Sequence, residues 1–376
     1  MRTLLTLLIC CLLTLALNGC GAGGGGGASS GPSSTPSALT TDATSPVATS
    51  TPLSTSLTLG GTTTLPPVSS PTPSPTSGGT SFTGSLASPL YVAIYTHCED
   101  KHHPATPDFS TDKASYITFR NAIIAFANAM HARNLSWNWQ SDYNFLEACK
   151  TYEVQQADAT LLASTGGMNV VQWLHDTSGA EIDPHSHEAD GYNYADVAYL
   201  ITQCGVTPAP VVGGHIYSPT DAHYQNWPKF IGGLQGSRYP QYTFTPNLLM
   251  GAGSSNHMSD AVVSGMWRPA SASSYFTDDP NGAIASFGTW DNDISKISDL
   301  LTLMSNGTLS PSLMWTAGYV FNQSDMTTAG YIDNTIVPQL DTLVSLRDQG
   351  AVQLVRFTEA TATWQTQYGA QGSVHQ

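Results

Sequence analysis

Apolar residues are distributed very differently along three parts of this chain. Residues 3–17 are an uncharged stretch of Leu, Thr, Ile, Ala and Cys. Residues 21–87 contain almost no large aliphatic or aromatic side chains. Regular apolar patterns begin near residue 88 and continue to the end of the chain, so we expect the folded part of the protein to lie there.

Strand-like and helix-like segments alternate over this last part. The expected strands are residues 90–96, 135–140, 180–187, 210–217, 312–321 and 352–358, with short strands or loop edges at 242–250, 264–269 and 284–290. The expected helices are residues 112–134, 162–177, 195–203, 293–304 and 331–348. Strands separated by helix-length segments predict an α/β fold with a parallel sheet, and this many of them predict a (β/α) barrel. In such barrels the functional residues collect at the carboxyl ends of the strands.

The first twenty residues have the features of an export signal. A basic start at Arg2 precedes an apolar stretch too short to cross a membrane, and Leu17-Asn18-Gly19-Cys20 follows at once. A small residue followed by cysteine resembles a bacterial lipoprotein signal. The resemblance implies that residues 1–19 are removed, that Cys20 carries the lipid, and that the protein is anchored to the bacterial cell envelope on its periplasmic or surface face. The alternative is an ordinary signal peptide with a chance cysteine.

Residues 20–87 are expected to be a disordered tether between the lipid and one domain formed by residues 88–376. The segment is rich in Gly, Ser, Thr and Pro, and Asp42 is its single charged residue after Cys20. Such a composition buries too little apolar surface to offset the conformational entropy lost on folding.

The overall charge argues against nucleic-acid binding. The chain has 12 Lys and Arg against 27 Asp and Glu, a net charge of −15, and no cluster of basic residues. Three cysteines remain in the domain, Cys98, Cys149 and Cys204, which allows at most one internal disulfide. No CxxC motif is present, so a thiolate zinc site is not expected.

Two clusters of candidate metal ligands follow predicted strands. Glu99 and Asp100 come directly after the first strand, where paired carboxylates are costly unless they are paired with cations or bound to metal. His185 and His187 lie two residues apart at the end of the strand that also carries Asp183. Residues two apart on a strand share a face, so both rings can point at one ion.

A third cluster is Trp267-Arg268-Pro269, after the predicted strand that includes residues 264–266. An arginine beside an aromatic residue at a strand end can fix the charge of a carboxylate and present a face on which a sugar stacks. Tyr192 and Tyr275 are further candidates for stacking on sugar rings.

Together the three clusters resemble the motifs of the polysaccharide deacetylase (NodB-homology) family. That resemblance implies a deformed (β/α) barrel of the glycoside hydrolase and deacetylase type, which removes acetyl groups from glycans with a divalent metal, zinc in our prediction. Glu99 would be the general base, and Asp100, His185 and His187 the metal ligands. Arg268 would be the partner of the base, and the three aromatic residues would bind the sugar.

The chain departs from the family pattern at two points. The second histidine of the family's motif would fall at Ala189, and His187 is its nearest substitute. The late Leu-x-His motif, which supplies the general acid, has no match, so His215 and His257 are the remaining candidates for that role.

Two other functions are consistent with the same residues. One is a catalytically silent barrel that binds glycans at the cell surface. The other is a metal-free glycoside hydrolase that uses two carboxylates such as Glu99 and Asp183. All three functions imply a glycan as partner and, through the lipid, a membrane.

Overall fold

The computed structural model describes residues 82, 84, 86–99, 107–188, 191–214, 216–217, 226–250 and 262–376. The chain divides into two units, residues 1–70 and 71–376, and every described residue belongs to the second. The predicted signal peptide, Cys20 and nearly all of the predicted tether lie outside the described residues. Asp100, His215 and His257 lie outside them as well. Among the described residues, no helix is both long and apolar enough to span a membrane.

Five parallel strands form the first sheet. In spatial order they are β12 (Thr316–Asn322), β1 (Leu90–Cys98), β2 (Asn138–Ser141) and β3 (Glu181–Pro184), with β13 (Val352–Leu354) paired to the start of β1. The central strand β1 has the sequence LYVAIYTHC, and eight of its nine residues are buried. A near-continuous apolar run is what a parallel strand covered on both faces requires.

A second sheet contains one reversed strand. Its order is β4 (Val211–Gly213), β7 (Leu248–Met250), β11 (Ala285–Thr289) and β8 (Ser264–Trp267). The first three run parallel, whereas β8 runs antiparallel to β11. Two hairpins complete the strands, β5 (Leu234–Gln235) with β6 (Thr243–Phe244) and β9 (Pro269–Ser271) with β10 (Ser274–Asp278).

The two sheets meet at both edges without forming a closed ladder. A single parallel bridge between His185 and Gly213 joins the end of β3 to β4. At the other edge the Thr316 hydroxyl of β12 accepts from the N–H of Gly265 (2.9 Å) and donates to the carbonyl of Gly288 (2.7 Å). The α/β class and the parallel sheet are therefore confirmed, and among the described residues no continuous backbone pairing closes a barrel.

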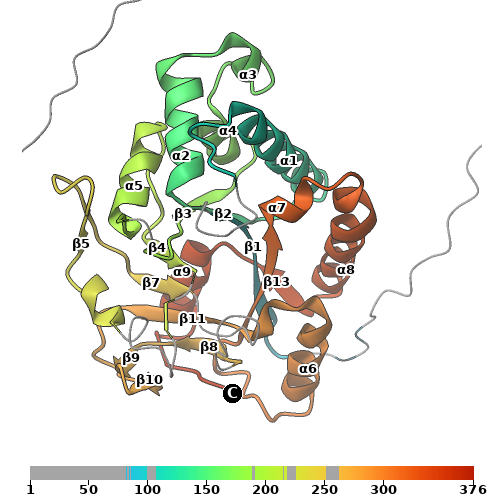
Figure 1. The fold of residues 1–376 in the computed structure, drawn as a ribbon. Coiled ribbons are helices and arrows are strands. Elements are labelled where there is room, and N and C mark those ends of the chain that lie inside the picture. The colour runs from blue at the N-terminus through green and yellow to red at the C-terminus, as the bar shows by residue number, and fades with distance from the viewer. Residues whose placement is uncertain are drawn as a thin grey trace, which may run out of the picture. The chain divides into compact units, whose positions relative to one another are not determined.

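Helices follow most strands, and Figure 1 shows α1, α2, α5, α6 and α8 around the outside of the strands. The α-helices are α1 (Lys113–His131), α2 (Tyr143–Cys149), α3 (Ala159–Ala163), α4 (Val170–Asp176), α5 (Tyr194–Gln203), α6 (Ile294–Ser305), α7 (Gln323–Met326), α8 (Val337–Asp348) and α9 (Phe357–Gln367). Short π- and 3₁₀-helices occupy η1 (Lys150–Gln155), η3 (Trp227–Phe230), η4 (Trp290–Asn292) and η5 (Ile332–Ile336).

The first helix shows how local sequence sets these elements. The Asp112 carboxylate caps α1 by accepting from the N–H of Ser115 at 3.0 Å. The apolar side chains spaced three or four apart face the core, as the sequence predicts, and include Phe119, Ile123, Phe126 and Met130. The predicted helix at 162–177 is instead two helices, α3 and α4, because Asn169 caps a new helix through the N–H of Gln172 (2.9 Å).

The end of the chain differs from the prediction of a strand over 352–358. The strand stops at Leu354, and α9 begins at Phe357. The N–H of Phe357 donates to Asn138 (3.1 Å), and the N–H of Thr358 donates to Glu181 (3.2 Å). Since these acceptors begin β2 and β3, α9 starts at the amino ends of the strands, opposite the carboxyl ends where barrel sites lie.

Candidate metal centre

The carboxyl ends of three neighbouring parallel strands bring five titratable side chains together. These side chains are His97 near the end of β1, Glu99 directly after β1, Asp142 directly after β2, and His185 and His187 from the segment after β3. Parallel strands in register end at one edge of a sheet, which explains why residues far apart in sequence meet there.

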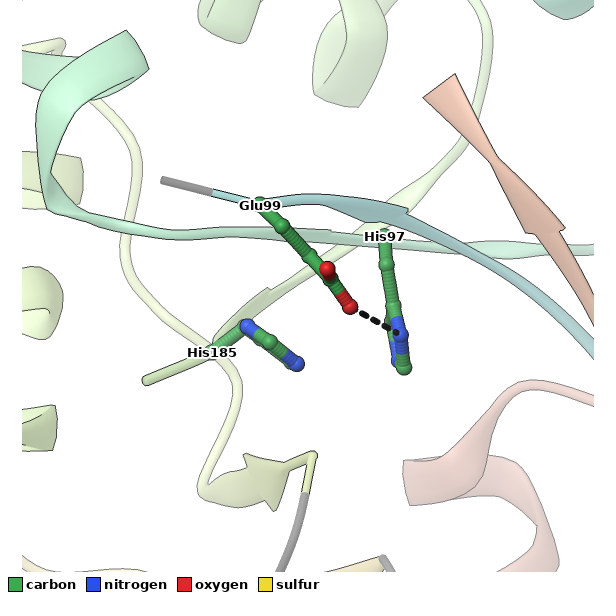
Figure 2. Close-up of side chains that lie close together, drawn as sticks. All are labelled: His97, Glu99 and His185. Carbon is green, nitrogen blue, oxygen red and sulfur yellow. Dashed lines mark ion pairs between the residues drawn. The ribbon is translucent and has the colours of Figure 1, made fainter. Parts of the chain in front are cut away.

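The ring nitrogens and carboxylates lie at ligand-like separations. Nδ1 of His97 is 3.7 Å from Oε1 of Glu99, and Nε2 of His187 is 3.9 Å from the same oxygen. The rings of His97 and His185 have centroids 4.4 Å apart. One ligand atom from each of His97, Glu99 and His185 lies within 4.8 Å of the other two, and the same holds for Asp142, His185 and His187. Figure 2 shows the Glu99 and His185 side chains turned toward the space beside His97.

Asp142 orients the ring of His185. Its Oδ1 contacts Nδ1 of His185, and neither side chain is more than 1% exposed. A carboxylate accepts only, so Nδ1 carries the proton and the lone pair of the neutral ring lies on Nε2. This carboxylate–histidine pair is the arrangement that commonly positions a metal-binding imidazole. Gly214 packs closely on the same ring, since a Cβ at that position would lie 2.7 Å from Nε2.

Gln140 orients His97 in the same way. Nε2 of His97 lies 2.9 Å from Oε1 of Gln140, and the Gln140 amide donates to Oδ2 of Asp183 at 3.3 Å. The amide oxygen accepts only, so Nε2 of His97 is the donor and Nδ1, the atom facing Glu99, carries the lone pair. Gly213 makes room for this chain of bonds, because a Cβ there would lie 2.4 Å from the Gln140 amide.

The pKa values of two carboxyl groups in this region, Glu99 and Asp183, are shifted in opposite directions. Burial by itself raises the pKa of Glu99, but the neighbouring imidazoles of His187 and His97 outweigh it and hold the pKa well below its usual range. Burial raises the pKa of Asp183 well above its usual range, and neighbouring Glu181 raises it further. Glu99 is therefore a charged carboxylate at neutral pH, whereas the interior around Asp183 favours the protonated acid.

The residues present fit a divalent transition metal. Two neutral imidazoles with defined tautomers and one ionised carboxylate match the His₂-carboxylate donor sets of catalytic zinc sites. His97, Glu99 and His185 would hold the ion, with Asp142 and Gln140 fixing the two rings from behind. His187, 13% exposed, lies at the outer side of this set next to Glu99.

The site only partly coincides with the one expected from the sequence. Glu99, His185 and His187 do come together, although Glu99 lies at ligand distance rather than apart as a base. Asp100 lies outside the described residues. His97, Gln140 and Asp142 were not selected from the sequence. His97 lies two residues before Glu99, and this spacing indicates that both side chains point to the same face. No local sequence pattern indicates Gln140 or Asp142.

Arg268 lies away from this site. Its guanidinium is 3.4 Å from the Asp278 carboxylate, donates to the carbonyl of Ala370 at 2.7 Å and covers the ring of Trp364. The reason is the direction of β8, since Trp267 pairs with Ser286 near the start of β11. The carboxyl end of β8 thus lies at the opposite end of the sheet, and the expected pairing of Arg268 with Glu99 is not found.

The aromatic residues expected to bind sugar are packed inside the protein. Trp267 is 0% exposed, and its indole N–H donates to the carbonyl of Tyr275 at 2.6 Å. Tyr275 stacks on Tyr217 with ring centroids 4.1 Å apart. Tyr192 is 3% exposed and packs against Tyr143. Their positions make them core residues, so the structure gives no support to sugar stacking on these rings.

Comparisons with known proteins do not identify a family. No family model matches the chain, and no curated protein matches it. Among solved structures, a 4-alpha-glucanotransferase from Thermococcus litoralis is similar at 10% sequence identity, with a TM-score of 0.41. The similarity covers 73% of this chain and 40% of that enzyme. A similarity this distant assigns neither family nor activity.

Proposed function

We propose that this domain is a metal-dependent hydrolase that removes acetyl groups from N- or O-acetylated glycans. The observation that carries the proposal is the set of His97, Glu99 and His185, each oriented for an ion in the space between them. The motif resemblance to polysaccharide deacetylases supports the choice of substrate and bond.

A divalent cation such as zinc supplies Lewis acidity at a carbonyl oxygen and makes hydroxide available near neutral pH. The protein's own contribution is to fix the orientation and tautomer of the metal-binding imidazoles. Asp142 keeps the proton of His185 on Nδ1, and Gln140 keeps that of His97 on Nε2. The imidazole rings therefore do not need to reorient when the metal binds or during the reaction.

His187 is the residue that we assign to proton transfer. Its Nε2 lies 3.9 Å from Glu99, and its side chain is more exposed than the His185 ring beside it. An imidazole beside the ligand set can deliver a proton to a leaving group. It replaces the general acid of the Leu-x-His motif that the sequence lacks.

Metal content tests this proposal directly. We expect about one equivalent of zinc or a similar ion per purified wild-type protein by inductively coupled plasma mass spectrometry. The variants His97→Ala and His185→Ala should lose it. His175→Ala is the matched control, because His175 also contacts a carboxylate, that of Asp176, but on the exposed surface of α4.

Activity is tested separately by acetate release from acetylated oligosaccharides. Wild type and His175→Ala should release acetate, and His187→Ala should bind the metal but release acetate about 10²–10⁴-fold more slowly. Absence of metal in wild-type protein, even after incubation with zinc, contradicts the metal centre. Metal binding without acetate release from any acetylated glycan contradicts the proposed reaction alone.

A further inference from the structure

Two buried cysteines lie at the ends of adjacent helices. Cys149 is the last residue of α2, and Cys204 follows the last residue of α5. Their exposures are 0% and 1%, and both belong to the same apolar cluster. Both carry reduced thiols in this structure.

Asn169 links the two cysteines. The Cys149 thiol lies 3.8 Å from Oδ1 of Asn169, and the Asn169 amide donates to the carbonyl of Cys204 at 2.9 Å. The neighbouring Cys149 thiol, followed by burial, raises the pKa of the Cys204 thiol. Asn169 is itself fixed as the cap of α4. The fold therefore places the two cysteines on either side of one fixed residue, at the ends of adjacent helices.

We propose that Cys149 and Cys204 form a disulfide when the chain folds in the oxidising compartment to which its N-terminal signal directs it. Disulfides form and persist in oxidising compartments. Of the three pairings that the domain's cysteines allow, the structure selects this one. Cys98, at the end of β1, is the thiol left over.

The reaction requires an external disulfide as oxidant, such as glutathione disulfide or an oxidised dithiol protein. One cysteine thiolate attacks the donor, forms a mixed disulfide and releases one donor thiolate. The second cysteine thiolate then attacks the mixed disulfide and releases the other. Two cysteines lose two electrons, the donor disulfide gains them, and the two cysteine protons pass to the released thiolates.

The disulfide would cross-link the segments that carry the candidate metal centre. It closes a loop of about 55 residues that contains β3, His185 and His187. The loop begins at the end of α2, the helix that follows Asp142 directly. Cross-linking a loop of this length restricts the unfolded chain, so it stabilises the fold without requiring a new contact in the site.

Peptide mapping of the exported full-length protein tests the pairing. Thiols are alkylated under denaturing conditions without reductant, and trypsin then separates the two cysteines because Lys150 lies between them. We expect a linked pair of peptides containing Cys149 and Cys204, with Cys98 alkylated. The same link should form when reduced, unfolded protein refolds in a glutathione disulfide buffer. Alkylation of all three cysteines after that refolding, or a link through Cys98, overturns the proposal.

Thermal unfolding of the wild-type protein gives a second readout. Reductant should lower the Tm of wild-type protein by roughly 10 °C, the order expected for a loop of this length in a domain of this size. The control variant Cys98→Ser should respond to reductant as wild type does. A double variant, Cys149→Ser with Cys204→Ser, should not respond. Equal Tm values for wild type with and without reductant overturn the proposal.

Discussion

Oδ1 of Asp142 contacts Nδ1 of His185 in the buried edge between β2 and β3, and no local sequence pattern relates these two residues. The backbone holds both ends of the contact. The N–H of Asp142 donates to the carbonyl of Cys98 at 3.0 Å, and the N–H of His185 donates to that of Ser141 at 3.2 Å. The imidazole orientation is thus set by sheet pairing.

Replacing Asp142 by asparagine should weaken metal binding while preserving the fold. Asp142→Asn keeps the shape and an acceptor oxygen but removes the charge that favours the Nδ1 proton. We expect about 10–100-fold lower zinc affinity, the usual effect of removing such a partner. Competition against a chromophoric chelator measures it. Asp176→Asn, which alters an exposed Asp–His contact, should leave affinity unchanged; equal affinities for all three proteins would exclude an orienting role for Asp142.

Gly214 should be required for the position of His185. Its φ of +104° strains any other residue, and the Cβ of Gly214→Ala would lie 2.7 Å from Nε2. Gly167→Ala is the matched control, because Gly167 has φ +91° and no atom within 4 Å of an added Cβ. Both variants should lose about 1–2 kcal/mol of stability by denaturant unfolding from backbone strain. Only Gly214→Ala should also lose metal; retained metal content would show that the His185 ring can shift without consequence.

Asp183 should make the protein less stable as pH rises from acid to neutral. Burial raises its pKa in the folded state, whereas the unfolded carboxyl titrates near about 3.9. Between these two values the folded state binds more protons, so the free energy of unfolding falls by about 1.4 kcal/mol per pH unit per proton. Asp183→Asn cannot titrate, and its amide oxygen can still accept from Gln140.

Urea unfolding at several pH values between 4 and 7 measures this difference. Asp183→Asn should show a flatter pH dependence and higher stability than wild type at pH 7. Asp299→Asn, on the exposed side of α6, should follow wild type. The same slope in Asp183→Asn and wild type would assign the pH dependence to other groups.

We propose that Cys20 anchors the protein to a membrane through a lipid. The prediction concerns the sequence alone, since Cys20 lies outside the described residues. Wild-type protein expressed with its own signal should sediment with membranes and incorporate labelled palmitate. Cys20→Ala should appear in the soluble fraction without label, and Cys10→Ala, within the removed signal, should behave as wild type. Soluble, unlabelled wild-type protein would instead indicate an ordinary signal peptide.

The period of the apolar pattern was sufficient for the elements whose stability is local. Helix α1 follows from its buried face and its Asp112 cap, and β1 from its continuous apolar run. The histidines after β3 could be recognised as candidate ligands because residues two apart in an extended segment share a face. These features depend on residues only a few positions apart, so they can be predicted from local sequence patterns.

The remaining features depend on partners from distant segments. The first N–H groups of α9 donate to Asn138 and Glu181, in addition to the local cap from Glu359 on the N–H of Arg356. The chain therefore forms a helix where its apolar pattern predicts a strand. Because β8 runs antiparallel to β11, Arg268 lies away from the site. Nothing in the local sequence of β8 indicates this reversed direction.

The sequence by itself determined that the chain alternates strands and helices and that His185, His187 and Glu99 follow strand ends. Only the tertiary structure decided that Asp142 and Gln140 hold the imidazoles and that His97 completes the set. The physical reason is that ligand geometry depends on which strands are neighbours and in which direction they run. Strand order is fixed by hydrogen bonding and packing over the whole sheet, and the local period of apolar residues carries no information about it.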